Sequence, residues 1–337
     1  MPKVTVLMPT YNVAPYVKEA IESVLHQTYA DFELLVIDDC STDQTVEVVR
    51  SIADPRVRLE QNESNLGLAD NLNRGLSLIH TEYVARMDGD DIAELDWLER
   101  EVAVLNNHPE IGVCGGCAKR FGTSDSLVML PETHEDCLVN MLFSCSTLVP
   151  VYRHELYSKY GLRYRKDAFP AEDYRFWADC IKVTRFYNVP KVLFHYRMHE
   201  TQICTSLKDI QVGKANEVRK LMLEWLNEDI SDRDRDYFLN TFVDGEIRDR
   251  RALDERYRFA KKLCQLNKMH RHYDGKSLRR GLSKHIRGIV YSTVINDYFG
   301  NGYRWNAYRK YLNSGMAFKT DCKYEVKLFL KCVLCRN

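Results

Sequence analysis

The sequence predicts an α/β fold: a mostly parallel, Rossmann-like sheet flanked by helices and followed by a helical domain. Over the first 110 residues, short apolar runs alternate with amphipathic helical stripes. This order produces parallel β-α-β units with right-handed crossovers. From about residue 206 onward, the pattern is that of long helices with polar faces. Hydrophobic residues make up 45% of the chain and charged residues 28%, a composition typical of a folded protein with a sizeable core.

Four strands and three intervening helices are expected before residue 90. Each strand is a short apolar run, and each helix carries apolar residues three or four positions apart. The expected strands are Val4–Met8, Phe32–Ile37, Val57–Glu60 and Tyr83–Met87. The expected helices are Ala14–His26, one that is capped by Ser41–Asp43 and buries Val46, Val49 and Ile52, and one that buries Ala69, Leu72, Leu76 and Ile79.

Beyond Asp91 the pattern is less regular. Helices are expected at Asp96–Asn107, Glu172–Lys182, Ile210–Leu226 and Arg256–Leu266, and strands at Gly112–Phe121 and Val192–Tyr196. The segment 131–151 carries both helix and strand signals. We place a domain boundary near Thr205, which predicts two domains, residues 1–205 and residues 206–337.

The neutral total charge conceals an uneven distribution. The chain has 48 lysines and arginines and 48 aspartates and glutamates. From Lys261 to the end there are 17 basic and 4 acidic residues, a net charge of +13, which leaves −13 on residues 1–260. The sequence therefore combines an acidic body with a strongly basic C-terminal region.

Compartment signals in the sequence favour the cytoplasm. No export signal precedes the first expected strand, and no apolar stretch approaches the roughly 20 residues that a membrane span requires. The 11 cysteines lie scattered in apolar runs, as expected for free thiols in a reducing compartment. Two Cys-x-x-Cys pairs, Cys114 with Cys117 and Cys332 with Cys335, have no histidine at ligand spacing, so a zinc site is not expected.

Polar residues follow three of the expected strands. They are Pro9–Asn12, Asp38-Asp39 and the segment Asp88–Asp91. Ligands of open parallel sheets bind at this carboxyl edge. Five carboxylates at one edge repel one another unless a cation or hydrogen-bond donors lie between them, and a hard divalent cation with oxygen ligands meets that need. Helix capping is the alternative explanation for Asp39 and Asp91.

Two common nucleotide-binding motifs are missing from the sequence. There is no Gly-x-Gly-x-x-Gly after the first strand and no Gly-x-x-x-x-Gly-Lys-Ser/Thr, which disfavours dinucleotide dehydrogenases and P-loop enzymes. The glycine-rich start of sugar nucleotidyltransferases is missing as well. What remains is a carboxylate-rich, metal-dependent nucleotide site.

Seven segments in order carry a family resemblance over roughly residues 1–205. They are Val4–Asn12, Ser23–Tyr29, Phe32–Asp43, Asn65–Leu68, Arg86–Asp91, Ala171–Trp177 and Tyr196–His199. In these segments the chain resembles the inverting family 2 glycosyltransferases, whose catalytic domain has the GT-A fold. The resemblance implies that residues 1–205 form a nucleotide-sugar-binding catalytic domain. The helical pattern and the basic charge of residues 206–337 predict a second domain for acceptor, membrane or oligomer contacts.

The resemblance implies a set of residues for donor binding. Thr10 and Tyr11 resemble the family's base and ribose contacts. Asp39 resembles the carboxylate that accepts a hydrogen bond from the uracil ring nitrogen, so a UDP-sugar is the expected donor. The full set of expected donor-binding residues is Pro9, Thr10, Tyr11, Asn12, Asp39, Asn65, Gly67, Arg86 and Asp88.

A metal ion and a catalytic base are also implied by the resemblance. Asp88 and Asp90 occupy the Asp-x-Asp positions that hold Mn²⁺ or Mg²⁺ against the donor diphosphate, and His199 resembles a third ligand or a diphosphate contact. The alternative for His199 is an ordinary surface or core histidine. Asp173 matches the family's base, which takes the proton from the acceptor hydroxyl. The alternative for Glu172 and Asp173 is an ordinary acidic helix start.

The sequence departs from the family pattern at two places. Both concern the sugar or acceptor pocket rather than the expected metal-binding acids and catalytic base. Leu72 stands where many relatives have an arginine before the asparagine that Asn73 resembles. Cys145–Pro150 replaces a segment in which close relatives often carry a histidine. The identity of the sugar or acceptor pocket is therefore left open.

The basic C-terminal region contains a cationic amphipathic segment. Its cationic positions are Lys276, Arg279, Arg280, Lys284 and Arg287, and its apolar positions are Leu278, Leu282, Ile286 and Ile289. The aromatic residues Tyr298, Phe299, Tyr303, Trp305 and Tyr308 follow, and then the basic run Lys319–Arg336. This pattern suits a bilayer surface rich in anionic lipid. An ordinary solvated helical face is the alternative, and a nucleic-acid partner is not expected.

The predicted function is transfer of a sugar from a nucleotide-sugar to a saccharide or a polyprenyl-diphosphate-linked saccharide in surface polysaccharide synthesis. The expected location is the cytoplasm or the inner face of the plasma membrane. The alternative is a catalytically silent, sugar-nucleotide-binding scaffold. Asp88, Asp90 and Asp173 together disfavour that alternative, because a binding module needs no base. The sequence predicts neither the donor sugar, nor the acceptor and linkage, nor the oligomeric state.

Overall fold

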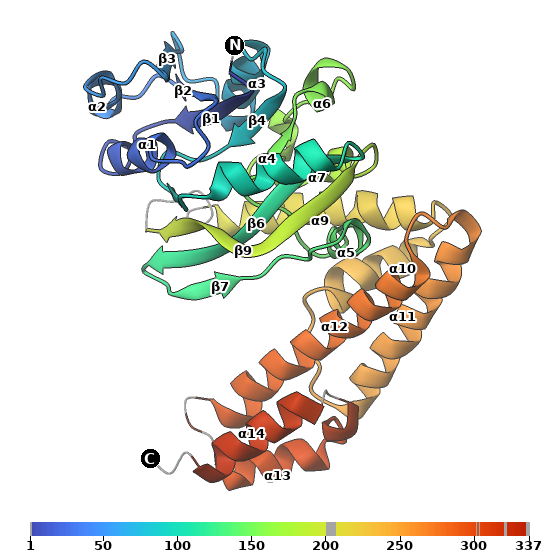
Figure 1. The fold of residues 1–337 in the computed structure, drawn as a ribbon. Coiled ribbons are helices and arrows are strands. Elements are labelled where there is room, and N and C mark those ends of the chain that lie inside the picture. Colours follow the sequence, from blue (N-terminus) through green and yellow to red (C-terminus); the bar gives the residue numbers. More distant parts are fainter. Residues whose placement is uncertain (1, 200–206, 301, 303, 320–321, 335–337) are drawn as a thin grey trace. The chain divides into compact units, whose positions relative to one another are not determined.

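The chain divides into two compact units, Met1–Val218 and Arg219–Asn337. The structure is a computed structural model, and it describes residues 2–199, 207–300, 302, 304–319 and 322–334 (Figure 1). The boundary expected at Thr205 falls among residues 200–206, outside the described residues. Within the described ranges, the strands all lie in the first unit, and the second unit is helical.

A single nine-stranded sheet forms the centre of the first unit, in the order β3-β2-β1-β4-β8-β6-β9-β5, with β7 paired to β6. The strands are β1 (Val4–Thr10), β2 (Phe32–Asp38), β3 (Val57–Gln61), β4 (Tyr83–Arg86), β5 (Ile92–Ala93), β6 (Ile111–Gly122), β7 (Ser126–Val128), β8 (Val151–Arg153) and β9 (Arg185–Met198). Strands β3, β2, β1 and β4 are mutually parallel, as are β6 and β9. Strands β5, β7 and β8 pair antiparallel with their neighbours, so the sheet is mixed.

Helices flank this sheet. They are α1 (Val17–Leu25), α2 (Thr45–Arg50), α3 (Leu68–Ser77), α4 (Trp97–Asn107), α5 (His134–Asn140), α6 (Glu155–Ser158), the 3-10 helix η1 (Lys166–Ala168) and α7 (Glu172–Cys180). Helix α9 (Lys208–Leu226) runs across the boundary between the units. All seven residues of β1 are buried, which is expected of a central parallel strand covered on both faces. The predicted α/β sheet flanked by helices is confirmed.

The last strand is much longer than its apolar run predicts. Val192–Tyr196 was the expected strand, and β9 extends from Arg185 to Met198. Polar residues and Pro190 interrupt the alternation upstream, and the pairing of β9 with β6 shifts register between Val189 and Val192. A bulge accommodates the proline, which lacks the N–H that a regular ladder requires.

The second unit is built mainly on two long helices. Its elements are α10 (Asp232–Tyr237), the π-helix η2 (Phe238–Phe242), α11 (Arg250–His270), α12 (Gly275–Thr293), the π-helix η3 (Val294–Phe299), α13 (Trp305–Asn313), the 3-10 helix η4 (Ala317–Lys319) and α14 (Cys322–Leu334). Helices α11 and α12 pack side by side (Figure 1). Among the described residues, no helix combines the length and the apolar character needed to cross a bilayer.

The cationic segment singled out in the sequence is helix α12, and its apolar positions serve the core. Leu278, Leu282 and Ile286 are buried, and Ile289 is half-buried. The amphipathic pattern therefore reflects packing within the helical unit rather than an apolar face available to a membrane.

Candidate active site

Three loops meet at the carboxyl edge of the parallel half of the sheet. They follow β1, β2 and β4, which are neighbours in the sheet in the order β2-β1-β4. Thr10 at the end of β1 pairs with Asp38 at the end of β2, so the two loops leave the sheet at the same level. The polar residues predicted to gather at this edge are therefore brought together.

The β1 end supplies two buried residues and two exposed ones. Pro9 and Thr10 are the last residues of the strand and are buried, whereas Tyr11 begins the loop with its ring largely exposed. Asn12 has a φ of 53°, in the left-handed region that asparagine tolerates better than most residues. Its side-chain Oδ1 accepts a hydrogen bond from the Thr42 N–H at 2.8 Å, which ties the β1 loop to the β2 loop.

The β2 end begins with Asp38, a fully buried carboxylate. Its Oδ1 accepts hydrogen bonds from the Thr10 hydroxyl at 3.1 Å and the Ser41 hydroxyl at 2.5 Å, and its Oδ2 accepts one from the Ser41 N–H at 2.9 Å. These hydrogen bonds come from the chain itself, and they offset the free-energy cost of burying the carboxylate. Asp38 is therefore a structural residue of the edge.

The next carboxylate, Asp39, holds the segment after β3. Its Oδ1 accepts hydrogen bonds from the Asn62 side-chain amide at 2.6 Å and the Leu66 N–H at 2.8 Å, and its Oδ2 accepts one from the Gly67 N–H at 2.8 Å. Asn65 donates to the backbone oxygen of Asp39 at 3.2 Å. Gly67 has a φ of +84°, a conformation that favours glycine. Asp39, Asn65 and Gly67 thus form one unit, as the donor-binding prediction requires.

A tight turn follows β4 and carries the Asp-x-Asp residues. A Cβ atom on Gly89 would lie 3.0 Å from Thr10 Cγ2 and 3.3 Å from Val13 Cγ2. Only glycine fits this approach without displacing a neighbour, because contacts this short are rare for real Cβ atoms. The turn is thereby pressed against the loop that follows β1.

Asp88 is paired with Arg86 within this turn. Arg86 Nη1 lies 2.7 Å from Asp88 Oδ2, and both side chains are largely buried. Burial raises the pKa of Asp88 to about 6, and the charges of Asp90 and Asp173 add to the rise, whereas Arg86 opposes it. The Arg86 Nε atom is buried and has no hydrogen-bond partner among the described residues.

Asp90 is paired with His199 from the far end of β9. The His199 Nε2 lies 3.1 Å from Asp90 Oδ2, and the imidazole ring packs against the Tyr16 ring in a tilted arrangement, with 4.9 Å between the ring centroids. Residues 109 positions apart in sequence are thus brought into direct contact. This contact places His199 beside one of the Asp-x-Asp acids. Its role as a metal ligand or diphosphate contact stays a prediction.

Arg197 lies in one of the segments that carry the family resemblance, but the sequence predicted no role for it. Its side chain and its backbone both contact the turn after β4. Its Nε donates to the Asp90 backbone oxygen at 2.7 Å, its backbone N–H donates to Asp91 Oδ1 at 2.9 Å, and its Nη2 pairs with Glu19 at 2.6 Å. Its guanidinium also lies over the Tyr16 ring at 5.0 Å. A lone arginine in a strand gives no sequence signal for such contacts, because they depend on the β5–β9 pairing.

Asp91 is the most deeply buried acid of the turn. Its Oδ1 accepts the bond from Arg197, and its Oδ2 has no partner among the described residues. Burial raises the pKa of Asp91 well above its usual range, with Asp90 and Asp88 adding to the rise. Helix capping, the alternative for Asp91, is not the role that these contacts show.

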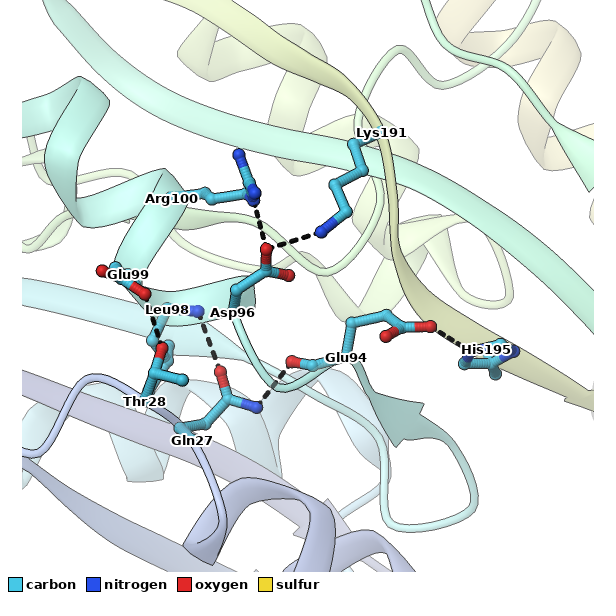
Figure 2. A network of polar contacts seen from close by, with 9 residues as sticks. All are labelled: Gln27, Thr28, Glu94, Asp96, Leu98, Glu99, Arg100, Lys191 and His195. Carbon is cyan, nitrogen blue, oxygen red and sulfur yellow. Dashed lines mark hydrogen bonds and ion pairs between the residues drawn. The ribbon is translucent and has the colours of Figure 1, made fainter.

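A polar network braces the strands behind this turn (Figure 2). Glu94, just after β5, pairs with His195 of β9 at 2.6 Å. Gln27, just after α1, donates to the Glu94 backbone oxygen at 2.7 Å and accepts from the Leu98 N–H at 3.0 Å. Because β5 follows the Asp-x-Asp turn directly and β9 leads to His199, this network fixes both sides of the Asp90–His199 pair.

Glu172 and Asp173 begin helix α7. Glu172 is 5% exposed, and its Oε2 has no partner among the described residues. Burial raises the pKa of Glu172 to about 7, and the Asp173 charge adds to the rise. Asp173 Oδ1 accepts from the Tyr174 N–H at 2.6 Å. The charge of Asp173 acts on both Arg86 and Asp88, so the start of α7 lies within electrostatic range of the Asp-x-Asp turn.

Aromatic packing holds α7 in this position. Phe176 stacks on Tyr164 at 4.1 Å between ring centroids, and Trp177 meets Tyr152 of β8 edge-on at 5.2 Å. The Tyr174 hydroxyl donates to the Met141 backbone oxygen at 2.5 Å. These buried contacts fix the helix start, as a positioned acid or base requires.

The segment Cys145–Pro150, which departs from the family pattern, comes near the start of α7. Burial raises the pKa of the Cys145 thiol above its usual range, and the nearby charge of Asp173 adds to the rise. The chain thus places Cys145 within electrostatic range of Asp173.

The donor atoms suit a divalent cation that is shared with a substrate. Among the described residues, no three histidine, cysteine or acidic side chains lie close enough together to hold a metal ion by themselves. Asp90 and His199 form an oxygen-and-nitrogen pair, and Asp88 faces Arg86 instead. Mg²⁺ and Mn²⁺ commonly bind through one or two side chains, with the other positions filled by substrate phosphates and water. The residues present fit such an ion.

This combination of a parallel half-sheet, an Asp-x-Asp turn at its edge and an acidic helix start coupled to it defines the GT-A class of sugar-transferring folds. A model of the family described as Glycosyl transferase family 2 matches residues 5–170. An uncharacterized glycosyltransferase of Haemophilus influenzae is 32% identical over 235 residues, which cover 65% of this chain and 72% of that protein. The chain belongs to glycosyl transferase family 2.

A further relative is also named as a glycosyltransferase. The putative teichuronic acid biosynthesis glycosyltransferase TuaG of Bacillus subtilis is 31% identical over 162 residues, 44% of this chain and 62% of that protein. The family match ends at residue 170, before Glu172, Asp173 and His199.

Solved structures share the fold. The crystal structure of S. aureus TarS 1–349 in complex with UDP-GlcNAc has a TM-score of 0.59 and 21% identity, covering 85% of this chain and 92% of that one. The mannosyltransferase PcManGT of Pyrobaculum calidifontis, in complex with GDP-Man and Mn²⁺, has a TM-score of 0.51 and 17% identity over 98% of this chain and 84% of that one. The GT-A fold predicted from the sequence is confirmed.

Proposed function

We propose that the protein is a metal-dependent, inverting glycosyltransferase that uses a nucleotide-sugar, with a UDP-sugar as the expected donor. The observation that carries this proposal is the meeting of two separate acidic groups at one sheet edge. Asp88 and Asp90 lie on the turn after β4, and Asp173 at the start of α7 acts electrostatically on Asp88. One group suits a metal and diphosphate, and the other suits proton removal.

The donor base and ribose are proposed to bind along the loops after β1 and β2. Asp39 fixes the Asn65–Gly67 segment through its Oδ1, which accepts two hydrogen bonds, and its Oδ2, which accepts one and keeps a lone pair for a ligand. TarS is described in complex with UDP and with UDP-GlcNAc, which supports a uridine nucleotide. PcManGT is described with GDP-Man, so a guanosine nucleotide is the comparison to include in a test.

Asp90 and His199 are proposed to hold the divalent ion, with Asp88 positioned beside it by Arg86. The ion supplies charge neutralisation for the diphosphate as it leaves. Arg86 contributes a fixed positive charge at the same place, because it is buried beside Asp88 and cannot be deprotonated at neutral pH.

Asp173 is proposed as the base that takes the proton from the acceptor hydroxyl. Its Oδ1 is occupied by the Tyr174 N–H, so Oδ2 is the oxygen proposed to receive the proton. Near neutral pH the adjacent Glu172 retains its proton for part of the time, because its pKa is raised to about 7.

The acceptor is proposed to be a saccharide or a polyprenyl-diphosphate-linked saccharide of surface polysaccharide synthesis. The name of TuaG, with its reference to teichuronic acid biosynthesis, supports this class of product. The protein is proposed to act in the cytoplasm, in part as a peripheral protein on the inner face of the plasma membrane, where such lipid-linked acceptors lie.

A donor panel tests the proposal. Nucleotide release is measured with UDP-sugars and GDP-sugars, each with Mn²⁺, with Mg²⁺ and with a chelator. The variant is Asp90→Ala, and the control is Asp125→Ala, an exposed carboxylate between β6 and β7. We expect one donor to give metal-dependent release that Asp90→Ala abolishes and Asp125→Ala leaves unchanged. If the wild-type protein binds a donor but transfers its sugar to no acceptor, the scaffold alternative is favoured.

A further inference from the structure

Helix α14 of the second unit exposes an apolar stripe. Val326, Phe329, Leu330 and Val333 are each between 42% and 52% exposed. Their spacing of i, i+3, i+4 and i+7 places all four on one side of the helix. Four neighbouring apolar side chains on one helix face differ from the single exposed hydrophobic residues that are normal on protein surfaces.

The opposite side of the same helix anchors it to the unit. Leu328 is buried, and the Glu325 carboxylate accepts a hydrogen bond from the Tyr311 hydroxyl of α13. The Phe329 ring lies 5.9 Å from the Tyr308 ring of α13. Packing of α14 within its unit therefore uses the face that carries Leu328 and Glu325, together with one edge of the Phe329 ring, and leaves the rest of the apolar stripe outward.

A row of lysines runs beside the stripe. Lys323, Lys327 and Lys331 are spaced four residues apart, so they form a line along the helix next to the apolar residues. The one acidic residue of α14, Glu325, is held on the inner side. On α13, Trp305 is 48% exposed and lies 5.8 Å from Tyr308, which itself contacts Phe329. The aromatic contacts thus continue from the stripe to an exposed tryptophan.

We propose that this surface, the α14 stripe with its lysine row, docks on a bilayer that contains anionic phospholipid; the inference rests on the membrane-side location proposed above. Apolar side chains of an interfacial helix enter the acyl-chain boundary, and lysines bind the anionic headgroups. With 13 residues, α14 is about 20 Å long, so it suits lying in the interface and is too short to span a bilayer.

The charge pattern favours a lipid surface over a second copy of the chain. In a two-fold dimer whose two α14 helices run antiparallel across the stripe, the lysine rows of both copies fall on the same side and lie together. Like charges that face one another in an interface are unfavourable. The other cationic helix, α12, is a less suitable docking element, because Leu278, Leu282 and Ile286 are buried inside the unit.

Vesicle sedimentation of the full-length protein tests the proposal. The vesicles are phosphatidylcholine alone and phosphatidylcholine with phosphatidylglycerol, at low and high salt. The test variant is Phe329→Ser with Leu330→Ser, and the matched controls are Leu127→Ser, an exposed leucine of β7, and Arg279→Glu with Lys284→Glu on α12. We expect salt-sensitive binding to the anionic vesicles alone, weakened at least about tenfold by the α14 variant and by neither control.

Two further readouts keep the outcome specific. Because both α14 substitutions are at exposed positions, thermal unfolding and donor-dependent nucleotide release in solution are expected to match the wild type. Normal nucleotide release without any vesicle binding overturns the docking surface and leaves the proposed function intact. Vesicle binding lost with the α12 variant instead, or a dimer in light scattering that the α14 variant dissociates, overturns it as well.

Discussion

Two acidic groups lie at the carboxyl ends of β2 and β4, on either side of β1 at the same sheet edge, and their hydrogen bonding differs. At the end of β2, every side-chain oxygen of Asp38 and Asp39 accepts at least one hydrogen bond from the chain itself. After β4, Asp91 keeps a buried oxygen without a partner among the described residues, and burial raises the pKa of Asp88 to about 6. The carboxylates at the end of β2 are thus hydrogen-bonded within the fold, whereas those after β4 carry charge that the fold does not fully balance.

The difference teaches that residue type and topological position do not determine the role of a carboxylate. A carboxylate that accepts several N–H or O–H bonds stabilises loop structure. A group of buried acids with raised pKa values is unfavourable by itself, and a cation or a proton relieves it. Substitutions in the two groups are therefore expected to separate: stability should fall in the first, and activity or metal binding should fall in the second.

The largest expected effect is on catalysis, for Asp173→Asn. Loss of the proposed base should lower the transfer rate by about 10² to 10⁴-fold, the usual contribution of general base catalysis. Donor binding measured by calorimetry should stay at the wild-type level, since Asp173 contacts the acceptor in the proposal. The control is Asp179→Asn in the last turn of the same helix, where the carboxylate pairs with Arg175. Unchanged transfer by Asp173→Asn would remove Asp173 from the mechanism.

The next effect is on stability, for Asp39→Asn. The amide replaces an acceptor oxygen with an N–H₂ donor that must face either the Gly67 N–H or the Asn62 amide. A buried donor left against a donor should lower the free energy of unfolding by about 3 kcal/mol, measured in urea. Asp70→Asn, an exposed carboxylate on α3 near Lys166, should change it by less than about 0.5 kcal/mol. Equal effects of the two variants would contradict the structural role of Asp39.

Much of this comparison was within reach of the sequence, and some of it was not. Alternating apolar runs predicted β1 to β4, and parallel neighbours necessarily bring their polar ends to one edge. Which acids are satisfied depends on donors from distant segments, such as the Leu66 and Gly67 N–H groups. Local spacing does not encode those bonds. The family resemblance, rather than periodicity, pointed to His199 as a partner of the Asp-x-Asp acids.

The misread features share a physical cause. A single amphipathic pattern does not say whether its apolar side faces the core or the outside. Helix α12 buries Leu282, whereas α14 exposes Phe329, and the sequence predicted a membrane surface for the basic region that contains both helices without separating them. Arg197 was likewise given no role, because its bonds to Asp90 and Asp91 arise only when β9 pairs beside β5.

A smaller effect is expected from Glu172→Gln, and it depends on pH. The folded-state pKa of Glu172, about 7, lies above its ordinary value of 4.5, so the ionised form destabilises the fold. Burial is the main cause, and the charges of Asp173 and Asp88 add to it while Arg86 opposes it. The native state therefore binds the proton more tightly, and stability falls as pH rises from about 4.5 to about 7.

The glutamine variant should accordingly be more stable than the wild type at pH 8, by about 3 kcal/mol, and nearly equal to it near pH 4.5. Urea unfolding of both proteins at the two pH values measures the difference. Glu155→Gln, an exposed member of a helical pair with Lys159, serves as the control. A pH-independent difference would show that the carboxyl group of Glu172 is not the source.

The smallest expected effect concerns Arg197, which acts on the metal site through Asp90 and Asp91 without touching the ion. Arg197→Ala should raise the Mn²⁺ concentration for half-maximal activity about tenfold, as is usual for residues that orient metal ligands. The maximal rate at saturating Mn²⁺ should be preserved, since Asp90, His199 and Asp173 remain. Arg100→Ala, which removes an exposed cation beside Asp96 in the network of Figure 2, should leave both values unchanged. A loss of maximal rate with an unchanged metal requirement would place Arg197 outside the metal site and would weaken the contrast between the two acidic groups.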